Sequence, residues 1–214
     1  MKILVVINYV DYSDPLKKRL QEDAIRTMIK RDGIMYVSFN FESDQVILPE
    51  HFVVFKTLTR DSSKTINNDR RLPYVKEILD KAFEIDSDIF GYMNSDVLLR
   101  DDFFDVFKDE LDVYMFSRYD IDSINSFKIV GQDHPGFDAV FFKKQWWMDN
   151  ASHFNSNLIL GEPAWDDYYC KTVKRYAEKF LIQRRLYHVY HPTIWNVTSN
   201  GSKNNINIHY GGGI

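Results

Sequence analysis

A chain of 214 residues fits one domain, and its 44% of hydrophobic residues is enough to bury a sizeable core. The net charge of -4 argues against a nucleic-acid-binding protein, because such proteins need a basic surface. The single cysteine excludes an internal disulfide, and no stretch approaches the roughly 20 apolar residues of a membrane-spanning helix. We therefore expect a cytoplasmic protein without a membrane span.

Apolar runs alternate with amphipathic segments along the chain. We predict strands at 3–7, 34–41, 52–58, 89–99, 113–117, 137–142 and 186–190. We predict helices at 14–32, 73–83, 102–107, 146–154 and 166–181, and a polar loop at 59–71. The alternation in the first half of the chain indicates parallel βαβ units, and therefore a single α/β domain over 1–214. A glycine run at 211–213 is typical of a linker, which would make this domain the first of a longer chain.

Polar residues interrupt the apolar segment at 89–99. Ligands bind beyond the carboxyl ends of parallel strands, so we expect the loops after residues 7, 58 and 93 to converge on one site. Asn94, Ser95 and Asp96 lie in the last of these loops, between apolar flanks. Burying Asp96 there would be costly unless it is paired or binds a cation, and a hard divalent metal prefers carboxylate oxygens. The alternative is a turn in which Asn94 and Asp96 hydrogen-bond backbone groups.

Two further acidic segments could carry chemistry. Asp166 and Asp167 open a predicted helix, where either could accept a proton from an acceptor hydroxyl. The alternative for this pair is simple helix capping. Gly136 permits a tight backbone shortly before Asp138, which enters an apolar strand. Asp138 could bind sugar hydroxyls there, or it could make a strand-entry hydrogen bond.

Histidines and cations complete the candidate residues. His188 and His191 lie three positions apart, and either could complete a metal site. In an extended strand their side chains would point to opposite faces, so we expect at most one of them to be a ligand. The polar loop at 59–71 carries four cations, Arg60, Lys64, Arg70 and Arg71. Cations at a strand end suit a diphosphate, although a solvated loop is the alternative.

The order of these motifs resembles that of the GT-A glycosyltransferases. The segment 94–96 resembles the family's D-x-D metal motif with its first aspartate replaced by asparagine, and 136–138 resembles the glycine-containing loop near the donor sugar. The segment 165–167 resembles the x-E-D motif, and His191 matches the C-terminal metal histidine. The resemblance implies a GT-A-like domain whose mixed, mostly parallel central sheet is flanked by helices. It also implies sugar transfer from a UDP-sugar to a hydroxyl of a glycan or glycoprotein, with Mn2+ or Mg2+ as cofactor.

The same resemblance implies roles for individual residues. Asp96 and His191 would bind the metal, and Asp167, or else Asp166, would be the base of an inverting reaction. The donor would contact Arg60, Lys64, Arg71, Asn94, Ser95, Asp96, Gly136 and Asp138. The chain is also similar to family members that glycosylate viral capsid proteins, which implies the host cytoplasm as their setting.

Two alternative functions share features with this pattern. A sugar nucleotidyltransferase has a similar α/β layout, but it carries a glycine-rich signature after the first strand, and residues 7–15 contain no glycine. A non-catalytic nucleotide- or glycan-binding module would have a decayed active site. The joint presence of Asp96, Asp138, Asp166 and Asp167 argues against such decay.

Overall fold

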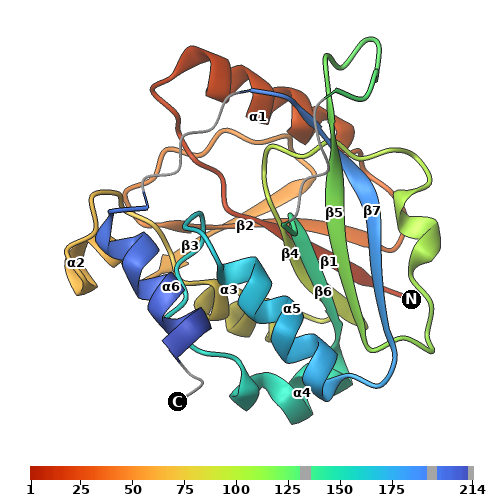
Figure 1. Ribbon diagram of the computed structural model, residues 1–214. Helices are drawn as coiled ribbons and strands as arrows, with labels where there is room; N and C mark the ends of the chain where they lie inside the picture. Colours follow the sequence, from red (N-terminus) through yellow and green to blue (C-terminus); the bar gives the residue numbers. More distant parts are fainter. Residues whose placement is uncertain (131–135, 192–196, 212–214) are drawn as a thin grey trace.

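The computed structural model describes residues 1–130, 136–191 and 197–211 (Figure 1). The strands are β1 (Ile3–Ile7), β2 (Ile34–Phe41), β3 (Phe52–Leu58), β4 (Ile89–Met93), β5 (Val113–Ile121), β6 (Ala139–Lys143) and β7 (Phe180–Val189). The helices are α1 (Pro15–Thr27), α2 (Ser62–Thr65), α3 (Val75–Phe83), α4 (Lys144–Asn150), α5 (Trp165–Tyr176) and α6 (Asn200–Gly211), with 3-10 helices η1 (Phe103–Val106) and η2 (Ala151–His153).

The strands form one sheet in the order β3-β2-β1-β4-β6-β5-β7. Neighbouring strands are parallel except at β6, which is antiparallel to both β4 and β5. The prediction of an α/β domain with a mixed, mostly parallel sheet flanked by helices is therefore confirmed. Among the helices of the described ranges, none combines the length and the apolar character that a membrane crossing requires.

The central strand β1 is buried on both of its faces. Its alternating side chains send Leu4 and Val6 to one side, where α3, α4 and α5 pack. Ile3, Val5 and Ile7 point to the other side, which is covered by the end of α1 and by η1. This two-sided burial explains why the strand reads as a continuous apolar run rather than as an alternating pattern.

Two predicted boundaries near β7 are wrong. We expected β5 to end before Arg118, but the strand continues to Ile121 in parallel with β7. The charge does not end the strand because Arg118 pairs there with Asp120 and Asp138. The helix predicted at 166–181 ends at Tyr176, and its last residues belong to β7 instead.

The C-terminal helix α6 was not predicted. Its buried residues are Gly201, Ser202 and Asn205, so it has no apolar stripe that periodicity could reveal. Polar contacts attach it instead: Ser202 Oγ donates to Glu162 at 2.7 Å, and Asn205 Nδ2 donates to the Ile159 carbonyl at 2.8 Å. The helix lies beside α5 (Figure 1). Of the glycine run predicted as a linker, 212–213 lies outside the described residues.

Candidate active site

Several strand ends place polar side chains at one edge of the sheet. β4 ends at Met93, directly before the segment 94–96, and the parallel strands β5 and β7 end close to Asp120 and His188. Because β6 is antiparallel to β4 and β5, its first residues lie at that same edge, and Asp138 immediately precedes them. The mixed sheet therefore gathers four separate segments of the chain at its β4–β7 edge.

Asp96, His188 and His191 form a group that could hold a metal ion. Each offers one ligand atom, and these atoms all lie within 4.8 Å of one another. Nε2 of the buried His188 lies 3.8 Å from Oδ2 of Asp96, whose side chain is 32% exposed. One carboxylate and two imidazoles are a donor set that divalent transition metals accept, so these residues fit Mn2+ better than Mg2+, the other metal that the resemblance implies.

We expected at most one histidine to be a ligand because the two side chains would point to opposite faces, but both rings lie near Asp96. That expectation assumed an extended strand through both residues, but β7 ends at Val189. Beyond that point the chain no longer alternates between faces, and the rings of His188 and His191 lie 4.9 Å apart. His188 therefore joins the predicted pair of Asp96 and His191.

A chain of buried polar contacts continues from the histidine into the sheet. His188 Nδ1 lies 3.0 Å from Oδ1 of Asp120, and Arg118 Nε donates to the same oxygen at 3.1 Å. Arg118 also donates through Nη1 to Asp138 Oδ1 at 2.7 Å, and Asn94 Nδ2 donates to that oxygen at 2.8 Å. Asn94 is thus a partner of Asp138, a role that explains an amide at the first position of the D-x-D-like segment.

Among these buried polar contacts, interactions between charges outweigh the free-energy cost of burying Asp120 and Arg118. Burial opposes the ionised form of Asp120, but the hydrogen bond from His188 and the charge of Arg118 prevail and lower its pKa. Burial likewise opposes the charge on Arg118, yet Asp138, Asp96 and Asp120 together raise the pKa of its guanidinium. The buried end of the site therefore holds a stable cation between carboxylates.

The acidic pair at the start of α5 is split between two environments. Asp166 is partly buried, and its Oδ2 accepts a hydrogen bond from the backbone N–H of Phe137 at 2.8 Å. Burial raises the pKa of Asp166 to about 6, and the neighbouring charge of Asp167 adds to the increase. Asp167 itself is exposed. The N-cap residue is Ala164, which has no polar side chain, but the backbone N–H groups of Asp166 and Asp167 in the first turn also interact with the Asp166 carboxylate, so the capping alternative stays open for Asp166.

Of the three predicted donor contacts in the polar loop, two are engaged elsewhere and one is exposed. The Arg60 guanidinium lies 3.9 Å from the centre of the Tyr74 ring and donates to Asn157 Oδ1 at 2.8 Å. Arg71 pairs with Asp44. Lys64 is exposed on the short helix α2.

The fourth cation of that loop, Arg70, is also paired with protein groups. Arg70 pairs with Glu162 at 3.1 Å and donates to the Gly161 carbonyl at 2.7 Å. Burial raises the pKa of Tyr12 to about 12, Asp96 adds to the increase, and Arg70 opposes it. Tyr12 lies in the loop after β1, Asp96 in the segment after β4 and Arg70 in the loop after β3. The loops after β1 and β4 meet at Gln21, which bonds to Val10 and to Ser95, whereas the approach of the loop after β3 stays a prediction. Tyr12 was not among the residues that the sequence analysis named.

Two other predicted donor residues occupy the same edge. The hydroxyl of the buried Ser95 donates to Oε1 of Gln21 in α1 at 2.8 Å, so it anchors the 94–96 segment to that helix. Gly136 is half-buried next to Phe137, and the residues directly before it, 131–135, lie outside the described part of the chain.

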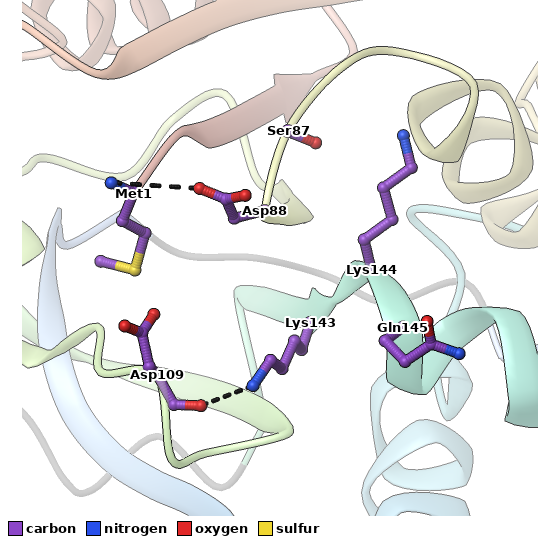
Figure 2. A pocket seen from close by; sticks show the side chains of 7 residues that line it. All are labelled: Met1, Ser87, Asp88, Asp109, Lys143, Lys144 and Gln145. Carbon is purple, nitrogen blue, oxygen red and sulfur yellow. Dashed lines mark hydrogen bonds and ion pairs between the residues drawn. The ribbon is translucent and has the colours of Figure 1, made fainter.

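A separate cavity of about 520 Å³ opens at the opposite end of the sheet. Figure 2 shows its lining. The amino group of Met1 lies near the carboxylate of Asp88, and Lys143 Nζ donates a hydrogen bond to the backbone carbonyl of Asp109. Met1 and Asp88 precede the parallel strands β1 and β4, so the cavity lies at their amino ends. Open α/β sheets bind ligands at the carboxyl ends, so the edge around Asp96 is the better candidate.

Comparisons with known proteins identify the fold. No family model and no curated protein matches the sequence. Among solved structures, residues 1–349 of the Staphylococcus aureus glycosyltransferase TarS, in complex with UDP-GlcNAc, match with a TM-score of 0.57 and 14% identity over 91% of this chain and 60% of theirs. A longer TarS structure matches with a TM-score of 0.56 and 12% identity over 90% of this chain and 37% of its own length.

A glycosyltransferase involved in the glycosylation of the major capsid of PBCV-1 matches with a TM-score of 0.47 and 12% identity, over 90% of this chain and 95% of its own. The chain spans about three fifths of the TarS 1–349 fragment. At these identities the TarS likeness concerns the fold and not the activity. The chain has the GT-A-like fold of the glycosyltransferases.

Proposed function

We propose that this chain is a metal-dependent glycosyltransferase that moves a sugar from a UDP-sugar to a hydroxyl of a glycan or glycoprotein. The observation that carries the proposal is the meeting of Asp96, His188 and His191 at the ligand-binding edge of a GT-A-like sheet. The nucleotide follows from the neighbours, because TarS of the same fold binds UDP-GlcNAc and UDP. The acceptor class and the cytoplasmic location remain predictions from the sequence.

The donor would lie between the metal group and the loop after β3. Bound Mn2+ or Mg2+ would supply positive charge that stabilises the departing diphosphate. Asp96 and the two histidines would hold that ion, and Asp138 would face the donor sugar while Asn94 and Arg118 fix its carboxylate. Asn94, Ser95 and Gly136 would shape the surrounding backbone.

We assign the cation that contacts the diphosphate to Arg70. Arg60, Lys64 and Arg71 were the predicted contacts. Lys64 faces solvent, and Arg60, Arg71 and Arg70 are all held by protein groups, so pairing alone does not decide between the arginines. Arg70 is the cation of the loop whose charge reaches Tyr12 beside Asp96. A guanidinium there could make charge-assisted hydrogen bonds to phosphate oxygens.

Asp166 is the better candidate for the catalytic base. The sequence motif placed Asp167 first, but Asp167 is exposed whereas Asp166 contacts the backbone next to Asp138. A pKa of about 6 makes the Asp166 carboxylate a stronger proton acceptor than an ordinary aspartate. It would remove the proton of the acceptor hydroxyl as that oxygen attacks the anomeric carbon, and UDP would leave with the electrons of the broken bond.

A single displacement of this kind inverts the anomeric centre. Retention by a double displacement would need a carboxylate free to attack the sugar. Asp138 is 1% exposed and its Oδ1 already accepts from both Asn94 and Arg118, which makes it a poor nucleophile. We therefore propose an inverting reaction.

The test is a transfer assay with a panel of UDP-sugars, Mn2+ and a mixture of glycan acceptors, with product analysis. The wild type should release UDP from one donor and form a product of inverted configuration. Asp96→Ala should lose this activity. Asp101→Ala is the matched control, because Asp101 is 97% exposed and contacts Arg31 rather than the site. Consumption of UTP and a sugar phosphate with release of pyrophosphate would instead identify a nucleotidyltransferase and overturn the proposal.

A further inference from the structure

His188 lies between two carboxylates that approach different ring nitrogens. Nδ1 is 3.0 Å from Oδ1 of Asp120, whereas Nε2 is 3.8 Å from Oδ2 of Asp96. The ring is 3% exposed, so it is held almost entirely by protein contacts. The two sides of His188 therefore differ: one makes a hydrogen bond, and the other faces a carboxylate across a gap.

The contact with Asp120 determines what Nε2 can do. A carboxylate only accepts, so a neutral His188 must carry its proton on Nδ1 and expose the lone pair of Nε2 towards Asp96. A separation of 3.8 Å is too long for a hydrogen bond between these atoms. Two ligands at about 2.1 Å from one ion lie roughly 3.0 Å apart at a right angle and about 4.2 Å apart in line. The gap between Nε2 and Oδ2 therefore matches two ligands of one metal.

The strand pairing supports this orientation independently. The register of β5 and β7 shifts after Ser117, so that Arg118 pairs with Leu186 and Asp120 pairs with His188. Such irregularities re-aim side chains and occur next to active sites. Arg118 then fixes Asp120 by donating from Nε at 3.1 Å, while its Nη1 reaches Asp138. The Asp120 carboxylate is thus held in place on the side away from the metal group.

We propose that Asp120 is a positioning residue that turns Nε2 of His188 towards Asp96 and makes His188 a second imidazole ligand beside His191. This inference rests on the proposed function, because it concerns the metal of that site. It also predicts the choice of metal. Mg2+ and Ca2+ prefer oxygen ligands, whereas imidazole suits transition metals. With two nitrogens and one carboxylate oxygen from the protein, the site binds Co2+ most tightly, then Mn2+, and Mg2+ weakly.

The experiment measures Mn2+ binding to the protein with saturating UDP by electron paramagnetic resonance. Asp120→Ala should weaken Mn2+ binding about 10- to 100-fold, the usual effect of losing such a partner of a metal-bound histidine. Asp120→Asn should recover part of that loss, because its amide oxygen still accepts from Nδ1. Asp122→Ala is the matched control, since Asp122 is exposed and accepts a hydrogen bond from Ser126, four positions further along the chain.

Two readouts on the wild type keep the proposal testable if a variant fails to fold. Pulsed resonance of bound Mn2+ should detect two imidazole nitrogens, and His188→Ala should leave one. Nitrogen NMR of the metal-free protein in mildly alkaline buffer should find the His188 proton on Nδ1. A proton on Nε2, a single bound nitrogen, wild-type Mn2+ affinity in Asp120→Ala, or equal affinity for Mg2+ and Mn2+ would overturn the inference.

These outcomes separate the inference from the proposed function. Sugar transfer that persists in EDTA, with no nitrogen bound to Mn2+, would overturn the metal inference and leave transferase activity standing. Two bound imidazoles and the expected effect of Asp120→Ala, without transfer from any UDP-sugar, would retain the inference and remove the proposed function.

Discussion

The backbone N–H of Phe137 donates a hydrogen bond to Oδ2 of Asp166 at 2.8 Å. Phe137 directly precedes Asp138, which takes part in the chain of contacts leading to the metal group. The bond therefore ties the start of α5 to the proposed donor site, and it holds a partly buried carboxylate beside the segment expected to face the sugar.

The first prediction separates activity from stability at this residue. Asp166→Asn should reduce turnover about 10²–10⁴-fold, the usual contribution of a general base. It should leave the melting temperature at neutral pH unchanged or raise it. The folded state raises the pKa of Asp166 from 3.8 to about 6 and therefore favours its protonated form, so ionisation of Asp166 lowers stability as pH rises through that window. An amide avoids this loss.

Melting curves and turnover should be measured together for Asp166→Asn and for the control Asp167→Asn. The control should keep most of its turnover, because Asp167 is exposed. Normal turnover in Asp166→Asn combined with a large loss in Asp167→Asn would show that Asp167, which the sequence motif favoured, is the base.

The second prediction concerns the pH dependence of turnover. A base must be ionised to act, so kcat/KM should rise with pH and level off above the Asp166 pKa of about 6. If the base were an ordinary aspartate, kcat/KM would instead level off above its usual pKa of 3.8. The profile is read from initial rates over a range in which the melting temperature shows the protein to be folded. A flat profile through this range would show that another group takes the proton.

The third prediction tests the reassigned cation. Arg70→Ala should weaken UDP binding about 10- to 100-fold in a calorimetric titration, since a hydrogen bond to a charged group contributes roughly 1.5–3 kcal/mol. Arg60→Ala should have a smaller effect, because Arg60 stacks on Tyr74 and bonds to Asn157. A larger loss in Arg60→Ala would support the donor contacts originally predicted from the sequence.

The fourth prediction concerns the attachment of α6. Glu162 is buried, and it accepts from Ser202 at 2.7 Å and Asn68 at 3.2 Å while pairing with Arg70. Glu162→Gln should reduce the free energy of unfolding by about 1–3 kcal/mol, because an amide cannot accept from all of these donors. Urea unfolding compared with the exposed control Glu178→Gln would measure the difference. Equal stability of the two variants would show that α6 is held by other contacts.

The sequence predicted the parts of the fold whose signal is local. The apolar run of β1, the Asp96 segment after β4 and the aspartates at the start of α5 all show in short stretches of residues. It did not predict the polar half of β5, because Arg118 and Asp120 also need partners from elsewhere, Asp138 just before β6 and His188 in β7. Contacts of this kind depend on strand order, which a single sequence does not show.

The same reason explains what was missed at the site and in α6. The sequence named both histidines as candidate ligands but not their meeting, which depends on β7 ending at Val189, before His191, and strand ends are poorly marked in sequence. α6 is attached through Glu162 and small residues, so hydrophobic periodicity could not find it.

The central claim is that Asp96 and its histidines bind a metal that holds a nucleoside diphosphate. The most direct measurement is a calorimetric titration of UDP into the wild type and Asp96→Ala, each with Mn2+ and with EDTA. The account predicts that Mn2+ tightens UDP binding to the wild type at least about tenfold, or roughly 1.4 kcal/mol, and has no effect on Asp96→Ala. Equal UDP affinity of the wild type with Mn2+ and with EDTA would contradict it.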